Sequence, residues 1–84
     1  MTNIKLTERS KKLFLAYAND APNWSGNPLV GGNVGGNKSD RGNLTDLKKK
    51  GLLKTFNDGE GFMWVQFTEI GKEYAKENGI ENLE

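Results

Sequence analysis

Apolar residues in the first quarter of the chain recur at the spacing of one face of an α-helix. Thr7 precedes them and belongs to the residue types that cap helix N-termini, because its hydroxyl accepts a hydrogen bond from a free backbone N–H. We therefore expect a helix that starts at Thr7 and ends between Asn19 and Pro22. The apolar residues near one another on this helix are Leu6, Leu13, Phe14 and Tyr17.

Residues 23 to 37, N-W-S-G-N-P-L-V-G-G-N-V-G-G-N, are rich in glycine and asparagine. Three large side chains in this stretch, Trp24, Leu29 and Val34, are too apolar to remain in water, so we expect an ordered loop and not a linker. Within it, Asn27 followed by Pro28 is typical of a helix cap and a first helical position. This pair predicts a single helical turn, Pro28 to Gly32.

The next helix is predicted to begin near Asn37 or Ser39 and to end at Lys50. Gly51 follows as the left-handed residue of a Schellman motif, in which Leu52 packs back on the last helical turn. This helix carries most of the positive charge in the centre of the chain.

Two strands, residues 52–57 and 62–68, are predicted to form a hairpin around the glycine-containing turn at 58–61. Because side chains alternate along a strand, one face receives Met63, Val65 and Phe67, and the other receives Phe62, Trp64 and Gln66. A last helix follows, capped by Thr68 and ended by Gly79 and Ile80. Its predicted inward residues are Ile70, Tyr74 and Ala75.

The composition allows one domain, residues 1–84, with a core at about residues 6–80. The chain has no cysteine and no histidine, which excludes disulfides, thiolate nucleophiles, imidazole bases and the common zinc ligand sets. We expect no enzyme activity, no metal and no cofactor. The longest apolar run, Leu13 to Ala18, is too short to span a membrane, and the start lacks a cleavage pattern, so we expect a cytoplasmic protein.

The order helix, short turn, helix, Gly-Leu-Leu, hairpin, Thr-Glu-x-Gly, helix resembles the winged helix-turn-helix domains of the MarR-like superfamily. The resemblance covers residues 7 to 80 and rests on Leu44, Leu47, Gly51, Leu52, Thr68, Glu69 and Gly71. It implies an α+β fold of three to four helices with a two-stranded β-hairpin wing, and a DNA-binding transcriptional regulator. The glycine-rich stretch and G-N-L-T-D-L-K-K-K-G-L-L also look like small uncharacterised phage and mobile-element proteins. The long flanking helices of MarR-type dimers are missing, which leaves the oligomeric state open.

The net charge of +1 is unevenly distributed: residues 38–54 carry six positive and two negative charges, and residues 69–84 carry two positive and five negative. If Leu44 and Leu47 are buried, the 100° step of a helix places Asp46 on the outward side together with most of the basic residues. Lysine and arginine there would neutralise phosphates, hydroxyls would bond backbone oxygens, and Asn43 or Arg41 would reach base edges. The candidate residues for binding double-stranded DNA are Lys38, Ser39, Arg41, Asn43, Thr45, Lys48 and Lys49. Basic residues of the first helix would add to this surface if that helix lies on the same side: Lys5, Arg9, Lys11 and Lys12.

Other interpretations of these features stay open at this point. The lysine-rich helix is also typical of a solvated surface, which Asp46 favours because a carboxylate repels phosphate. Trp64 either stacks on a base or partner, or covers the core beside Trp24 and Phe56. Either the backbone N–H groups of residues 35–39 hold one phosphate of a nucleic-acid backbone, or the glycines there only let a tight turn pass Trp24. The alternative function is a protein-interaction module in which Trp64, the acidic hairpin tip and the acidic last helix dock on a host protein.

Overall fold

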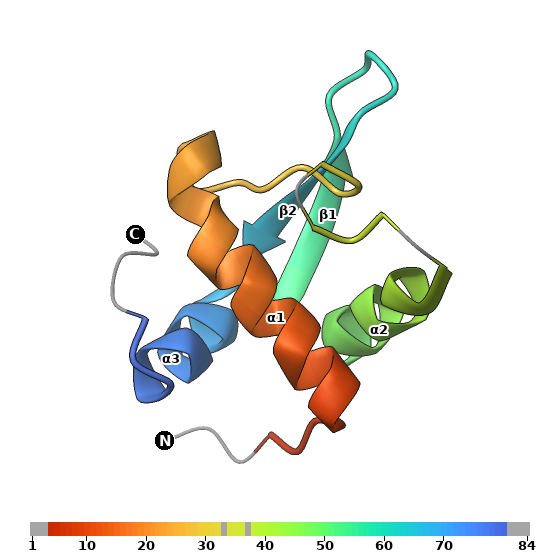
Figure 1. Cartoon of the computed structure of the whole chain (residues 1–84). Coiled ribbons are helices and arrows are strands. Elements are labelled where there is room, and N and C mark those ends of the chain that lie inside the picture. The colour runs from red at the N-terminus through yellow and green to blue at the C-terminus, as the bar shows by residue number, and fades with distance from the viewer. Residues whose placement is uncertain (1–3, 33, 37, 81–84) are drawn as a thin grey trace.

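The computed structural model describes residues 4–32, 34–36 and 38–80. Its elements are, in chain order, α1 (Glu8–Asp20), the 3-10 turn η1 (Ala21–Trp24), α2 (Lys38–Lys49), β1 (Leu53–Asn57), β2 (Met63–Phe67) and α3 (Glu69–Glu77). Figure 1 shows α1 crossing over the base of the hairpin, with α2 and α3 on either side and the hairpin tip projecting beyond the helices. Three α-helices and a two-stranded antiparallel sheet make an α+β fold that is compatible with a winged-helix-like layout.

The helix boundaries follow the capping chemistry of the sequence. The Thr7 hydroxyl accepts a hydrogen bond from the Ser10 N–H at 3.2 Å, so the predicted start of α1 is confirmed. Helix α2 begins at Lys38 and ends at Lys49, one residue before the predicted end; Asn37 lies outside the described residues.

The predicted Schellman motif at the end of α2 is confirmed. Gly51 has a φ of 79°, and the Leu52 N–H donates to the Leu47 carbonyl at 3.1 Å. The same chemistry ends α3, where the Ile80 N–H donates to the Ala75 carbonyl at 2.9 Å. Each glycine therefore turns the chain out of its helix and returns an apolar residue to the last turn.

Phe14 of α1 lies at the centre of the core. Its ring packs edge-on against Phe67 of β2, with centroids 5.7 Å apart, and against Tyr74 of α3, with centroids 5.3 Å apart. Aromatic pairs prefer this perpendicular arrangement, and it holds α1, the hairpin and α3 together. The buried side chains around it include Leu13, Tyr17, Leu44, Leu47, Leu52, Leu53 and Val65.

The hairpin has the predicted pairing of faces with slightly shorter strands. Leu53 pairs with Phe67 and Thr55 with Val65, so the face that carries Val65 and Phe67 is buried against α1 and α3. Lys54 pairs with Gln66, and Phe56 with Trp64, on the opposite face.

The helical turn predicted at Pro28–Gly32 is wrong. Residues 28–30 are extended and lie along β2: the Val65 N–H donates to the Pro28 carbonyl at 2.8 Å, and the Val30 N–H donates to the Met63 carbonyl at 2.9 Å. No helix follows Asn27 directly, and its side-chain amide instead donates to the Val65 carbonyl of β2 at 3.0 Å. Pairing with β2 satisfies backbone N–H and carbonyl groups that a single helical turn would leave without partners. The short helical turn in this part of the chain is η1, which comes earlier, at Ala21–Trp24.

Thr68 and Gly71 join α3 to the end of α2. The Thr68 hydroxyl lies 2.6 Å from the Gly51 carbonyl and accepts the Gly71 N–H at 2.9 Å, which also caps α3. A Cβ atom on Gly71 would collide with the carbonyl oxygen of Leu52. The Thr-Glu-x-Gly sequence therefore allows two backbone segments to approach closely.

The interior of α3 agrees with the sequence at Tyr74 and Ala75, which are buried, but not at Ile70, which is 46% exposed. The face of α3 that meets the core is centred near Gly71. At about 100° per residue, Ile70 lies roughly a quarter turn from that centre. The prediction for Ile70 is wrong because the close approach at Gly71, and not the largest apolar residue, sets the rotation of the helix.

We expect Gly71→Ala to lower the free energy of unfolding by about 1–3 kcal/mol, because the added methyl group forces the α3 backbone away from Leu52. Gly42→Ala is the matched control: a Cβ added to this exposed glycine of α2 would have no neighbour within 4 Å, so alanine should be neutral or stabilise by up to about 1 kcal/mol. Urea denaturation followed by tryptophan fluorescence measures both. Equal stability of Gly71→Ala and the parent chain would contradict the close approach.

Candidate nucleic-acid interface

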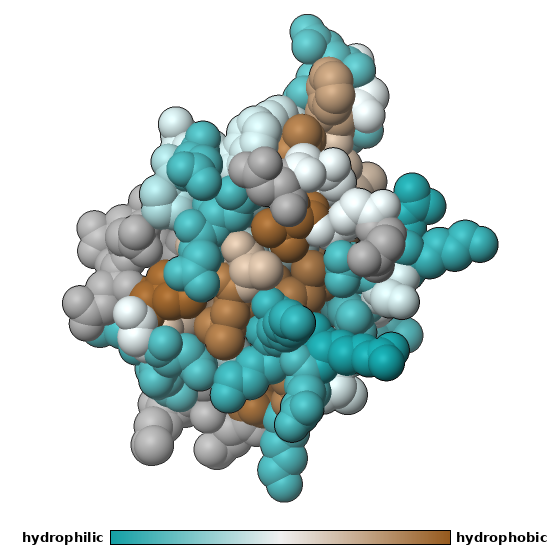
Figure 2. All heavy atoms as spheres, viewed as in Figure 1, coloured by the Kyte–Doolittle hydropathy of each residue, from teal (hydrophilic) through white to brown (hydrophobic). Residues whose placement is uncertain are grey.

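One face of α2 is basic and exposed to solvent. Leu44 and Leu47 are buried, and six of the seven candidate residues from the sequence are exposed; Asn43 is not. We use the term cationic face for the exposed residues Lys38, Arg41, Thr45, Lys48 and Lys49. The first four recur every three or four residues and Lys49 follows Lys48 directly, so at 100° per residue all five fall on one side of the helix over about 16 Å. In Figure 2, hydrophilic side chains project from the side of the molecule where α2 lies.

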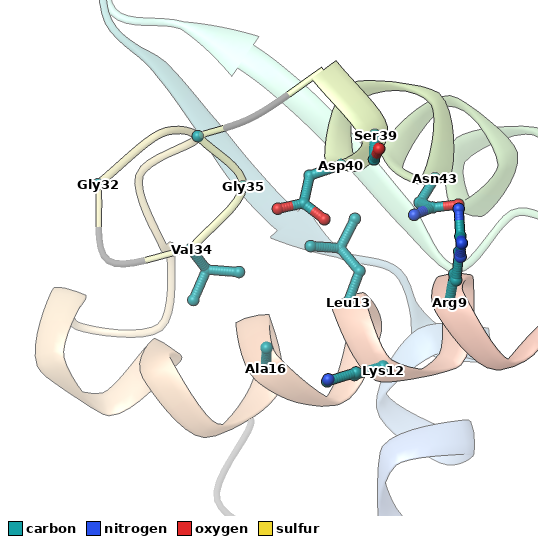
Figure 3. Close-up of a pocket in the computed structure, with 11 residues that line it drawn as sticks. Arg9, Lys12, Leu13, Ala16, Gly32, Val34, Gly35, Ser39, Asp40 and Asn43 are labelled. Atoms are coloured by element: carbon teal, nitrogen blue, oxygen red, sulfur yellow. The ribbon is translucent and has the colours of Figure 1, made fainter.

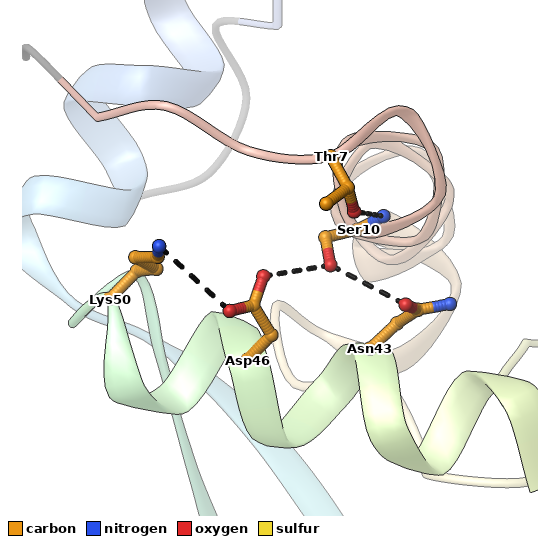
Figure 4. A network of polar contacts seen from close by, with 5 residues as sticks. All are labelled: Thr7, Ser10, Asn43, Asp46 and Lys50. Carbon is orange, nitrogen blue, oxygen red and sulfur yellow. Dashed lines mark hydrogen bonds and ion pairs between the residues drawn. The ribbon is translucent and has the colours of Figure 1, made fainter.

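Asp46 does not lie on the outward side of α2, so that prediction is wrong. It is half-buried, accepts a hydrogen bond from the Ser10 hydroxyl of α1 at 2.9 Å, and forms an ion pair with Lys50 at 3.9 Å. Figure 4 shows Ser10 reaching from α1 to both Asp46 and Asn43 on α2. Helix α1 packs on this flank of α2, which the positions of two leucines alone do not reveal. The carboxylate that opposed phosphate binding is thus held against α1, with 35% of its side chain still exposed.

Asn43 lies between the helices and away from the cationic face. It is half-buried, and its side-chain oxygen is 3.5 Å from the Ser10 hydroxyl. That hydroxyl has one proton to donate, so the shorter contact with Asp46 takes precedence. Asn43 thus lies at the contact between α1 and α2 and not on the outer surface of α2. Arg41, in contrast, is exposed to solvent.

Two polar residues of the cationic face make contacts within the fold. The Thr45 hydroxyl donates to the Arg41 carbonyl one turn earlier at 3.0 Å, so it offers lone pairs to the outside and would have to rotate to donate. The Lys48 ammonium donates to the Thr55 hydroxyl of β1 at 3.4 Å. This contact brings the end of the cationic face to the base of the hairpin.

A groove of about 740 Å³ separates the first half of α1 from the start of α2 and the glycine-rich loop. Arg9 and Lys12 line its α1 side, and Ser39 and Asn43 line its α2 side. Figure 3 shows Asp40 pointing from α2 into this groove toward Leu13. The two cations of α1 thus lie across the groove from the start of α2, and none of the residues of the cationic face lines this groove.

The glycines of the loop are explained by close packing. Gly35 has a φ of 84°, and a Cβ there would collide with the hydroxyl of Tyr17. A Cβ on Gly32 would lie 3.3 Å from the Trp24 ring. The Tyr17 hydroxyl is buried and finds no hydrogen-bond partner among the described residues. Burial, and then the nearby carboxylates Asp40 and Asp20, raise the Tyr17 pKa to about 12.

The hairpin tip has the opposite charge and is held by its own side chains. The Asp58 carboxylate accepts hydrogen bonds from the Glu60 N–H at 2.8 Å, the Phe62 N–H at 3.3 Å and the Trp64 indole N–H at 3.0 Å. The Trp64 ring meets Trp24 edge-on at 5.7 Å, which confirms the packing interpretation of Trp64. Residues 55–63 contain Asp58 and Glu60 but no lysine or arginine.

The described residues contain no group of three or more acidic residues arranged to hold a metal ion. Within the same part of the chain, no helix has the length and apolar character needed to cross a membrane. Comparison of the chain with protein-family models, curated proteins and solved structures found no match. The geometry and charge of the chain itself are therefore the basis for assigning a function.

The pKa of Asp58 lies below its ordinary value of 3.8, first because the Trp64 indole and then because the Glu60 N–H donates to the carboxylate. The ionised form is favoured in the folded state, so its contribution to the hairpin is present above pH 3.8 and is lost as the pH falls through the lowered pKa. We expect the NMR signal of the Trp64 indole N–H to titrate with a midpoint below 3.8. The control, Asp58→Asn, should abolish that transition. A midpoint at or above 3.8 would contradict the hydrogen bond.

Proposed function

We propose that this chain binds double-stranded DNA through the cationic face of α2, with the helix seated in the major groove as in winged-helix proteins. The observation that carries the proposal is the separation of charge on α2: the basic residues point to solvent, whereas Asp46 is turned toward α1. A helix face that presents cations without carboxylates over about 16 Å matches the charge of a phosphate backbone. Arg41 is the candidate for base contact, since arginine pairs with guanine in the major groove.

The cations of α1 support the same surface. Arg9 and Lys12 lie across the groove from Ser39, so a DNA backbone that passes the start of α2 would meet positive charge on the α1 side, whereas the Asp40 carboxylate faces the groove from the α2 side. The hairpin is assigned no phosphate contact, because its tip is acidic and phosphate would be repelled. This binding mode would use helices for contact and would leave the hairpin outside the interface.

The chain has 84 residues and contains no cysteine or histidine that could serve as a nucleophile or zinc ligand. If it binds DNA, these properties fit a small transcriptional regulator. The resemblance to winged-helix regulators and to small phage and mobile-element proteins favours the same role. Contact through one short helix buries little DNA surface, so we expect weak, strongly salt-dependent binding from a single copy.

Fluorescence polarisation of a labelled random-sequence duplex, at several salt concentrations, tests the proposal. About four phosphate contacts predict that the logarithm of the association constant falls with the logarithm of salt with a slope near −3.6. Binding with little salt dependence, or no binding at about 100 µM protein and low salt, would contradict DNA binding by this face.

Replacement of Lys48 and Lys49 with alanine should weaken binding and reduce the slope by about 1.8, because two phosphate contacts are removed. The matched control replaces Lys72 and Lys76 of α3, which changes the net charge by the same amount on another helix. Equal losses in the two double variants would show a non-specific charge effect and would contradict the assignment to α2.

A further inference from the structure

The outer part of the hairpin exposes large apolar side chains that the fold does not use. Phe56 is 43% exposed, Phe62 is 51% exposed and Met63 is 41% exposed. Among the described residues, the other large hydrophobic residue exposed to this degree is Ile70 on α3. Three such residues thus fall within a stretch of eight positions, Phe56 to Met63, on the hairpin that projects beyond the helices in Figure 1.

The strand register and the bonds at the hairpin tip bring aromatic and acidic groups close together. Phe56 pairs with Trp64, so these two rings share one side of the hairpin, and Phe62 comes directly before β2, where its carbonyl accepts the Asp58 N–H at 3.2 Å. Asp58 lies on that side too, because its carboxylate accepts the Trp64 indole N–H. We use the term distal hairpin surface for Phe56, Asp58, Glu60, Phe62 and Trp64.

This surface is held in shape before any partner binds. Asp58 accepts three hydrogen bonds from within the hairpin, and Asn57 accepts the Gly59 N–H at 2.8 Å. Trp24 packs against Trp64 from the body of the protein, and residues 28–30 are bonded to β2. A surface that is already ordered loses less conformational entropy on binding.

We propose that the distal hairpin surface binds a protein segment that presents arginine beside an apolar side chain. The chemistry favours arginine because a guanidinium stacks on aromatic faces and also pairs with carboxylates. Glu60 supplies an exposed carboxylate, and Phe56 and Phe62 supply exposed rings. The cation on this face of β1, Lys54, lies two residues before Phe56, toward the base of the hairpin, and residues 55–63 hold none. The same charges repel a phosphate backbone, so a protein partner fits this surface better than a nucleic acid.

Binding of such a segment does not depend on DNA binding. The cationic face lies on α2, and the distal hairpin surface carries the opposite charge at the outer end of the hairpin. The two surfaces would allow the protein to bind DNA and a protein partner at the same time, and each can fail in experiment without the other.

Selection of random seven-residue peptides displayed on phage tests the proposal, with the intact chain as the target. Peptides that bind the Phe62→Ala variant are removed by counter-selection. The enriched sequences should contain arginine next to an apolar residue. Failure to enrich any sequence, or enrichment of peptides without arginine, would overturn the proposal.

The affinity of one enriched peptide should fall by about fivefold or more in Phe62→Ala and in Glu60→Gln, since each removes a contact to arginine. Ile70→Ala and Glu69→Gln are matched controls, because they make the same kinds of change at exposed positions on α3. They should leave the affinity unchanged. An affinity that is unchanged in both hairpin variants would overturn the assignment of the surface.

A second copy of the chain could also bind the distal hairpin surface, because it carries exposed Arg9 and Arg41. Sedimentation equilibrium of the parent chain should give the monomer mass at concentrations that saturate the peptide. A dimer that dissociates in Phe62→Ala would overturn the proposal in favour of self-association.

Discussion

The rotation of α2 about its own axis decides which charges the protein presents to solvent. Burial of Leu44 and Leu47 sets that rotation coarsely, and the hydrogen bond from Ser10 to Asp46 adds a polar contact on one flank. A buried leucine contributes about 1.5–3 kcal/mol, and a hydrogen bond to a charged group contributes about the same amount while both partners are present. Together they turn Asp46 toward α1 and the basic residues of the cationic face toward solvent.

The segment at residues 28–30 is the second feature that organises the molecule. By pairing with β2 it fastens the hairpin to the body, and by following η1 it brings Trp24 to Trp64. The glycine-rich loop that follows then passes close to Tyr17, where Gly35 is required. The loop leaves a groove beside the start of α2.

The features that the sequence predicted correctly depend on neighbouring residues. The cap at Thr7, the Schellman motif at Gly51, the hairpin faces and the cap at Thr68 all follow from side chains within a few positions of each other. Such local chemistry acts in the same way in most folds, so it can be inferred from sequence.

The errors arose where distant segments decide the outcome. The extended structure at Pro28 depends on β2, which lies far along the chain, and local helix signals could not indicate that partner. The inward turn of Asp46 and the half-buried position of Asn43 depend on Ser10 of α1, and the exposure of Ile70 depends on the contact between Gly71 and Leu52. The cationic face could be recognised in the sequence because lysine and arginine favour solvent, but its freedom from carboxylates could not.

A ¹⁵N-resolved NMR titration of the chain with a short random-sequence DNA duplex would locate the contact without altering any residue. If α2 is the binding element, amide signals from Lys38 to Lys49, together with those near Arg9 and Lys12, should shift in proportion to bound DNA. The signals of Asn57 to Gly61 should stay in place. Shifts concentrated at the hairpin tip, with α2 unaffected, would contradict DNA binding through the cationic face.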